Sequence, residues 1–149
     1  MLSHILIPTD GSDLAQKGVD YGLWLADGYG GKVTIITVTE QPPVPSIGES
    51  EWGKVGMDPD HLPENASTRH AKAILSAAKA AAEKIGLSVE TLHTQNVSPA
   101  AAIVDVAKKN GCSLIVMASH RRRGIKSILL GSQTAEVLAT APIPVLVVP

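Results

Sequence analysis

Short apolar runs alternate along the chain with longer stretches in which apolar residues recur at helical spacing. Five runs predict strands, at residues 3–8, 32–39, 88–95, 114–117 and 145–148. Several of them are apolar at consecutive positions, as in Ile5–Ile7 and Leu114–Met117. This pattern is typical of strands that are covered on both faces of a sheet.

Four helical patterns separate these runs, at residues 13–29, 64–85, 99–109 and 132–140. In the first of them Leu14, Gly18, Tyr21, Leu25 and Gly28 fall near one face. Its glycines weaken the helix but would let it pack close to a sheet.

The alternation of strands and helices places two polar segments at the same edge of the predicted sheet. Thr9–Ser12 follows the first strand, and residues 118–132 follow the fourth. In parallel sheets, ligands bind outside the carboxyl ends of the strands, where the strand order reverses. We therefore predict one α/β domain over residues 1–149, with a doubly wound parallel sheet and a binding site at both segments.

The second polar segment combines positive charge with the start of a helix. It contains Arg121, Arg122, Arg123 and Lys126, and a helix begins near Ser132. Unpaired N–H groups and the helix dipole favour an anion at such a terminus. The alternative is a solvated basic loop, because short basic loops are common. Its position at a strand end favours the anion site.

The stretch from Gln41 to Pro63 is rich in proline and glycine. A loop of this length in a compact domain is usually functional or mobile. Trp52 and Met57 would allow it to fold back as a partial lid, but we expect a disordered surface loop.

The 149 residues carry a formal net charge of −1. This balance argues against a nucleic-acid binder, which usually shows a strong basic excess. No apolar run approaches the roughly 20 residues needed to span a membrane, and no signal peptide precedes the first strand. We therefore expect a cytoplasmic protein. The one cysteine, Cys112, excludes an internal disulfide, and we expect it to be buried.

The histidines do not indicate a catalytic or metal site. His4, His61, His70 and His93 lack the spacing of metal ligands. Ser119 and His120 are adjacent, with no Gly-x-Ser-x-Gly elbow, so we expect no catalytic pair.

Three motifs resemble the universal stress protein family: Ile5-Leu-Ile-Pro-Thr-Asp-Gly-Ser12, Leu130-Gly-Ser132 and Ala141-Pro-Ile-Pro-Val-Leu-Val-Val148. The resemblance covers nearly the whole chain. It implies an adenine-nucleotide α-hydrolase-like fold, with a five-stranded parallel sheet of order 3-2-1-4-5 flanked by four helices. It also implies binding of ATP, with Mg²⁺ as a candidate ion, and pairing of two chains through their last strands.

ATP-binding members of this family carry a Gly, two residues, a second Gly, nine residues and then Gly-Ser or Gly-Thr. This chain keeps the spacing and Gly131-Ser132, but has Ala118 and Arg121 in place of the first two glycines. Where the backbone needs φ > 0, a residue other than glycine costs about 1–3 kcal/mol. The Arg121 side chain would either obstruct a phosphate or bind it with its planar guanidinium, and both alternatives stay open.

The resemblance implies a site of twelve residues. Asp10 would accept hydrogen bonds from the ribose or help to hold a metal ion. Pro8 and Thr9 would line the adenine edge, and Val38 would meet the adenine through its backbone. The others would contact the base or the phosphates: Met117, Ala118, His120, Arg121, Gly131, Ser132, Gln133 and Thr134. Of these, Ser132, Gln133 and Thr134 would offer backbone N–H groups and hydroxyls to the phosphates.

Three functions agree with these residues. The first is an ATP-binding sensor or regulator in a stress response, which is the one we expect. The second is an ATP-independent, dimeric interaction protein of the same fold. The third is a slow ATPase, but no Glu, Asp or Gln that would activate water follows the basic segment before Gln133.

The last predicted strand consists of Val145, Leu146, Val147 and Val148, and carries no charge. A monomer usually blunts an exposed sheet edge with Lys or a bulge. We therefore predict a homodimer in which two such edges pair antiparallel across a two-fold axis. The alternative is that the segment from Gln41 to Pro63 covers the edge within one chain.

Overall fold

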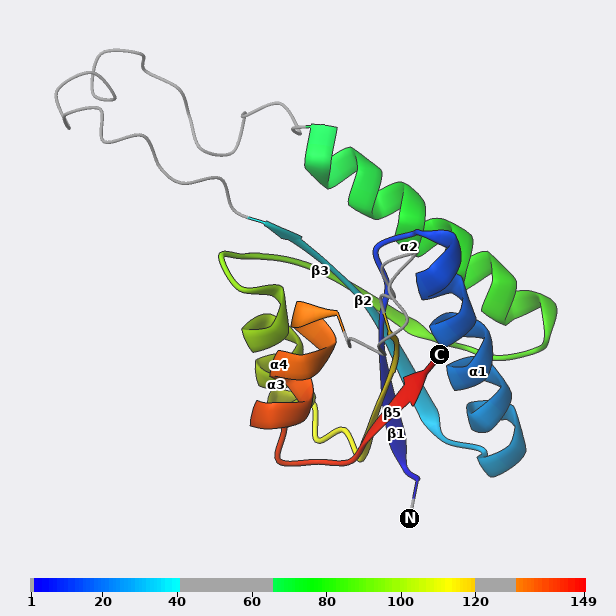
Figure 1. The fold of residues 1–149 in the computed structure, drawn as a ribbon. Helices are drawn as coiled ribbons and strands as arrows, with labels where there is room; N and C mark the ends of the chain where they lie inside the picture. Colours follow the sequence, from blue (N-terminus) through cyan, green and yellow to red (C-terminus); the bar gives the residue numbers. More distant parts are fainter. Residues whose placement is uncertain (1, 41–65, 120–130) are drawn as a thin grey trace, which may run out of the picture.

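The computed structural model describes residues 2–40, 66–119 and 131–149, which form five strands and four helices in alternation (Figure 1). The strands are β1 (His4–Pro8), β2 (Lys32–Glu40), β3 (Glu90–Asn96), β4 (Leu114–Ala118) and β5 (Val145–Val148). The helices are α1 (Asp13–Tyr29), α2 (Ala66–Lys84), α3 (Pro99–Lys109) and α4 (Ser132–Thr140). The predicted order of elements is confirmed, and only their ends differ from the prediction.

The five described strands are all parallel and lie in the order β3-β2-β1-β4-β5, which confirms the predicted doubly wound sheet. From β1 the chain builds β2 and β3 on one side and then β4 and β5 on the other. The strand order therefore reverses beside β1. At this point the carboxyl ends of β1, β2 and β4 lie next to one another, as a ligand site in such a sheet requires.

Apolar side chains fill both faces of the sheet, as the consecutive apolar residues of β1 predict. Ile5 and Ile7 pack in one layer with residues of α1 and α2, whereas Leu6 packs in the other layer with residues of α3 and α4. All three side chains are fully buried. Figure 1 shows α1 and α2 on one side of the sheet and α3 and α4 on the other.

The face that α1 turns toward the sheet differs from the predicted one. Its buried residues are Ala15, Gly18, Val19, Gly22, Leu23 and Ala26. Of the predicted face, Gly18 is buried, but Tyr21 is 52% exposed and Gly28 is also exposed. Apolar residues at spacings of three and four occur on both of these faces of the helix. The face that is buried carries the small residues, which allow the helix to come closest to the strands. A Cβ at Gly18 would lie 3.0 Å from the backbone N of Ala118, which confirms the predicted close packing.

The ends of the helices carry the local signals that begin and end helices. Ser12 accepts a hydrogen bond from Ala15 N–H at 3.1 Å, and Ser98 accepts one from Ala101 N–H at 3.3 Å. Pro99 occupies the first turn of α3, as predicted. Gly30 ends α1 with a positive φ of 69°, which glycine adopts without strain.

Two of the predicted features lie outside the described residues. They are the loop that contains Trp52 and Met57, and the basic segment that contains His120 and Arg121. Within the described ranges no helix is both long enough and apolar enough to cross a membrane. Cys112 is buried, as predicted, and this burial raises the pKa of its thiol.

Candidate functional site

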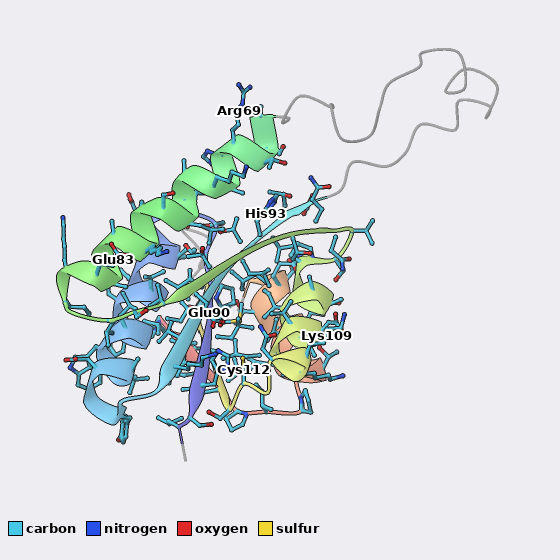
Figure 2. All side chains as sticks on the ribbon, turned by 180° about the vertical axis from the view of Figure 1, so that it is seen from behind. Arg69, Glu83, Glu90, His93, Lys109 and Cys112 are labelled. Carbon is cyan, nitrogen blue, oxygen red and sulfur yellow. The ribbon has the colours of Figure 1, made fainter. Side chains whose placement is uncertain are left out.

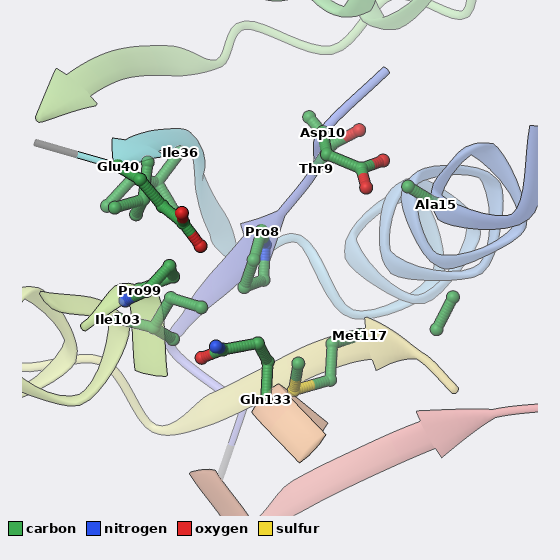
Figure 3. A pocket seen from close by; sticks show the side chains of 12 residues that line it. Pro8, Thr9, Asp10, Ala15, Ile36, Glu40, Pro99, Ile103, Met117 and Gln133 are labelled. Atoms are coloured by element: carbon green, nitrogen blue, oxygen red, sulfur yellow. The ribbon is translucent and has the colours of Figure 1, made fainter. Parts of the chain in front are cut away.

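A cleft of about 260 Å³ lies at the carboxyl ends of β1, β2 and β4, beside the first turns of α3 and α4 (Figure 3). Seven of the twelve predicted site residues line it: Pro8, Thr9, Asp10, Val38, Met117, Ala118 and Gln133. Five described residues that the sequence did not indicate also line it: Ala15, Ile36, Glu40, Pro99 and Ile103. The fold therefore brings most of the predicted residues together.

One wall of the cleft is apolar. Ile36 and Val38 extend along β2, Ile103 lies on α3, and Met117 lies near the end of β4. These four residues belong to one apolar layer, with Val38 packed against it as a partly buried residue. An apolar wall with few polar groups suits a flat ring system, because burial of apolar surface favours binding and the polar groups set orientation.

Among the described residues, the backbone N–H and C=O of Val38 have no partner in β1 and lie at this wall. Thr9 N–H donates to the Ile36 carbonyl at 2.9 Å, so the backbone groups of Ile36 face β1. Backbone groups of alternate residues in a strand point to the same side. The N–H and C=O of Val38 therefore face the same side as those of Ile36. The last pair between the two strands is Pro8 with Ile36, so Val38 lies beyond the end of β1. A ligand edge with one donor and one acceptor fits this pair.

Asp10 lies at the rim of the cleft, in the turn that joins β1 to α1. Its Oδ1 accepts a hydrogen bond from Ser12 N–H at 2.9 Å, and Thr9 Oγ1 accepts one from Gly11 N–H at 3.2 Å. Gly11 has a positive φ of 79°, so the tight turn favours glycine there. The turn holds an exposed carboxylate in place beside the cleft.

The first turn of α4 faces the same region. Its N-cap residue is Gly131, which has no side chain that could cap the helix, and the first backbone bond within the helix runs from Ala135 N–H to Gly131 O at 3.0 Å. Among the described residues, the N–H groups of Ser132, Gln133 and Thr134 therefore have no partner in the helix. Amides of this kind, together with the helix dipole, attract an anion.

Two side chains at this helix start have structural partners. Thr134 is fully buried, and its hydroxyl donates to the Ala118 carbonyl at 3.3 Å. In this arrangement the hydroxyl is bonded to β4, and the backbone N–H of Thr134 is the group that belongs to the amides at the helix start. Gln133 Oε1 accepts a hydrogen bond from Ala100 N–H at 2.9 Å and so joins α4 to α3.

Of the five other predicted residues, the described ones, Gly131, Ser132 and Thr134, do not line the cleft. Gly131 and Ser132 lie at the start of α4 and are described, whereas His120 and Arg121 lie outside the described residues. Two of the missed residues had a signal in the sequence. Side chains of a strand alternate between its faces, so Ile36 and Glu40 share the face of Val38. Pro99 and Ile103 belong to a helix that only the tertiary structure places here.

Among the described residues that line the cleft, the charged groups are two carboxylates, Asp10 on the β1–α1 turn and Glu40 at the end of β2. In the described part of the chain no group of three or more His, Cys, Asp or Glu residues is arranged to hold a metal ion. Mg²⁺ does not need such a group, because it is often held by substrate phosphates and one or two carboxylates. Asp10 has the chemistry required for that role.

Comparison with known proteins agrees with this fold and site. A profile of the universal stress protein family matches residues 1–149, and the chain belongs to this family. Universal stress protein YxiE of Bacillus subtilis is 31% identical over 151 residues, which cover 99% of each chain. The structure of MJ0577, a universal stress protein of Methanocaldococcus jannaschii, is 30% identical with a TM-score of 0.76, and the match covers 99% of this chain and 96% of that one.

Two solved relatives contain adenine nucleotides. The universal stress protein of Archaeoglobus fulgidus in complex with dAMP is 22% identical, with a TM-score of 0.70 and full coverage of both chains. A universal stress protein in complex with cAMP is 23% identical, with a TM-score of 0.69 and coverage of 99% of this chain and 96% of that one. These similarities show the shared adenine-nucleotide α-hydrolase-like fold.

Proposed function

We propose that this universal stress protein binds an adenine nucleotide, ATP in particular, in the cleft and acts as a cytoplasmic sensor or regulator in a stress response. The observation that carries the proposal is the arrangement of the cleft. The backbone N–H and C=O of Val38, which have no partner among the described residues of β1, lie at an apolar wall, and the first-turn amides of α4 lie at the same sheet edge. A planar base and a phosphate chain need these two environments side by side. The dAMP and cAMP complexes of two relatives support the choice of adenine.

Each part of the nucleotide would have its own residues. The base would pack on Val38, Ile103 and Met117 and bond the backbone of Val38. The ribose hydroxyls would donate to the Asp10 carboxylate, which would also be available to Mg²⁺ held by the phosphates. The phosphates would accept hydrogen bonds from the backbone N–H groups of Ser132 and Gln133.

Ala118 does not oppose this proposal. Among the described residues no residue other than glycine has a positive φ, so Ala118 adopts an ordinary backbone conformation at the end of β4. Replacement of the family's glycine by alanine therefore introduces no backbone strain at this position. Arg121 remains the replacement that matters most for phosphate.

Isothermal titration of the purified protein with ATP and MgCl₂ tests the proposal. We expect saturable binding, and weaker binding by Asp10→Ala. Absence of heat at millimolar ATP would instead favour an interaction protein of this fold that works without ATP. Arg121→Gly then separates two mechanisms: tighter binding means that the arginine obstructs the phosphate, and weaker binding means that it holds the phosphate.

We also propose that the protein forms a homodimer through β5. This strand is one edge of the described sheet, and it carries only valine and leucine. Leu146 at its centre is 37% exposed, while Val145 and Val147 are half-buried. Pairing with β5 of a second copy would satisfy the backbone groups of this edge and cover Leu146. A dimer of this kind serves both the nucleotide sensor and the ATP-independent alternative.

A further inference from the structure

Glu40 places a carboxylate beside the apolar part of the cleft. It is the last residue of β2 and shares the sheet face of Ile36 and Val38, because side chains alternate along a strand. All three residues line the cleft. Figure 3 shows the Glu40 carboxylate directed inward among the lining side chains, on the opposite side of the view from Asp10. Glu40 is exposed to solvent, so a ligand that covers it must replace its water with a hydrogen-bond donor.

The described surroundings of Glu40 provide no cation. On the same sheet face, β3 sets Thr94 opposite Val38 and Asn96 opposite Glu40. His93 bonds Thr39 at 2.9 Å and so lies on the other face of the sheet. No Lys or Arg lines the described cleft, and no hydrogen bond or ion pair joins Glu40 to a described residue.

Glu90, at the far end of the sheet, differs from Glu40 because it has a cationic partner. Its carboxylate lies 3.1 Å from Lys32 Nζ and forms an ion pair. An ionised carboxylate only accepts hydrogen bonds, so a ligand group that binds the Glu40 carboxylate must be a hydrogen-bond donor. Phosphate is excluded as that group, because like charges repel and the α4 amides attract the anion elsewhere.

The backbone of Val38 specifies where the donor lies on the ligand. Its N–H and C=O match a ring nitrogen beside an amino group. An amino group carries two hydrogens, and the Val38 carbonyl accepts only one of them. The second hydrogen would point outward along β2, toward the strand end where Glu40 stands. A purine with an oxygen at this position would instead set an acceptor against both the Val38 carbonyl and the Glu40 carboxylate.

We propose that Glu40 is a specificity-determining residue, which selects 6-aminopurine over 6-oxopurine nucleotides by accepting the second amino hydrogen. This inference rests on the proposed nucleotide site and goes beyond it, because the site would bind ATP without Glu40 but would discriminate less. Hydrogen bonds to charged groups are strong enough to change an affinity about tenfold.

The test compares ATP with ITP, which differ at the 6-position of the base and carry the same triphosphate. Dissociation constants are measured by titration calorimetry for the wild type, for Glu40→Gln and for Glu83→Gln. Glu83 is exposed on the outer side of α2, away from the cleft, so its variant controls for the loss of one negative charge (Figure 2). Any general effect of charge on the triphosphate cancels in the ratio of ITP to ATP dissociation constants.

We expect the wild type to prefer ATP, Glu40→Gln to reduce the ITP-to-ATP ratio by about tenfold, and Glu83→Gln to leave it unchanged. The glutamine amide would donate to the 6-oxygen of ITP and so remove the part of the penalty that Glu40 imposes, while the mismatch with the Val38 carbonyl stays. An unchanged ratio in Glu40→Gln, with ATP still bound, would overturn the role of Glu40 while the nucleotide site stands. Absence of ATP binding in the wild type would overturn the site itself, and the selectivity with it.

Discussion

Gln133 and Ala100 join the two helices beside the cleft. The side-chain oxygen of Gln133, in the first turn of α4, accepts a hydrogen bond from the backbone N–H of Ala100 in the first turn of α3, at 2.9 Å. The N–H groups at a helix start have no partner within the helix, so this bond satisfies one of them. It also fixes the distance between the two helix starts that border the cleft.

Gln133→Ala should therefore lower the free energy of unfolding by about 1–2 kcal/mol, because the N–H of Ala100 loses its acceptor. Nucleotide binding should weaken as well, since the start of α4 is no longer held against α3. Urea unfolding followed by circular dichroism measures the first effect. Gln16→Ala is the control: Gln16 bonds Asp20 on the exposed surface of α1, and its loss should cost only a few tenths of a kcal/mol.

Gly18→Ala should destabilise the protein, although alanine favours a helix by about 1 kcal/mol over glycine. The new Cβ would lie 3.0 Å from the backbone N of Ala118, so either α1 or the end of β4 must move. Overpacking of this kind typically costs about 1–3 kcal/mol. Because Ala118 lines the cleft, ATP affinity should fall too.

Gly28→Ala is the matched control for Gly18→Ala in the same helix. A Cβ at Gly28 would meet nothing within 4 Å, so only the gain in helix propensity should remain. We expect this variant to be more stable than the wild type by about 0.5–1 kcal/mol. Equal changes in the thermal midpoint of the two variants would show that α1 does not pack closely on β4.

Asp10→Asn and Asp10→Ala should separate the two roles of Asp10. Asparagine keeps an oxygen that can accept the Ser12 N–H, whereas alanine loses it. Both variants lose the negative charge that would bind the ribose or Mg²⁺. We expect about tenfold weaker ATP binding in both, and a larger loss of stability in Asp10→Ala than in Asp10→Asn. If Asp10→Asn binds ATP as well as the wild type, the carboxylate has no role in binding.

Leu146→Lys should convert a dimer into a monomer, because the charge would be buried where two β5 edges meet. Static light scattering of the purified proteins gives their masses. Val97→Lys is the control, since Val97 is 77% exposed between β3 and α3, near the opposite edge of the sheet. A monomeric wild type, or a Leu146→Lys variant that still dimerises, would exclude this interface.

The ion pair of Glu90 with Lys32 predicts a small dependence of stability on pH. The hydrogen bond from Lys32, followed by its positive charge, lowers the pKa of the Glu90 carboxyl. A lowered pKa in the folded state adds stability above the unfolded pKa, and this stability is lost as the pH falls through the folded value. The thermal midpoint of wild type should therefore exceed that of Glu90→Gln slightly near pH 7, and the difference should vanish in acid. The effect is small because both side chains are largely exposed.

The sequence alone determined the order of elements and the two strand ends that carry polar residues. Consecutive apolar residues in β1 and β4 reveal strands buried on both faces, because this property depends only on local composition. The positions of Asp10 and Ala118 at the edge of the sheet could therefore be predicted, since each lies at or just after the end of such a run. The glycines of α1 likewise indicated close packing against the sheet, because a residue without a side chain lets a helix approach a strand.

Only the tertiary structure decided which side chains share the cleft and which face of α1 is buried. Helical spacing allowed Tyr21 to point inward, but the close approach of Gly22 to Ile7 in the sheet placed Tyr21 outward. Pro99 and Ile103 reach the cleft because α3 crosses beside the end of β2, a long-range contact that no local pattern records. Local periodicity specifies what an element is and where it ends. The packing of elements far apart in the chain determines which residues of other elements lie beside the end of a given strand.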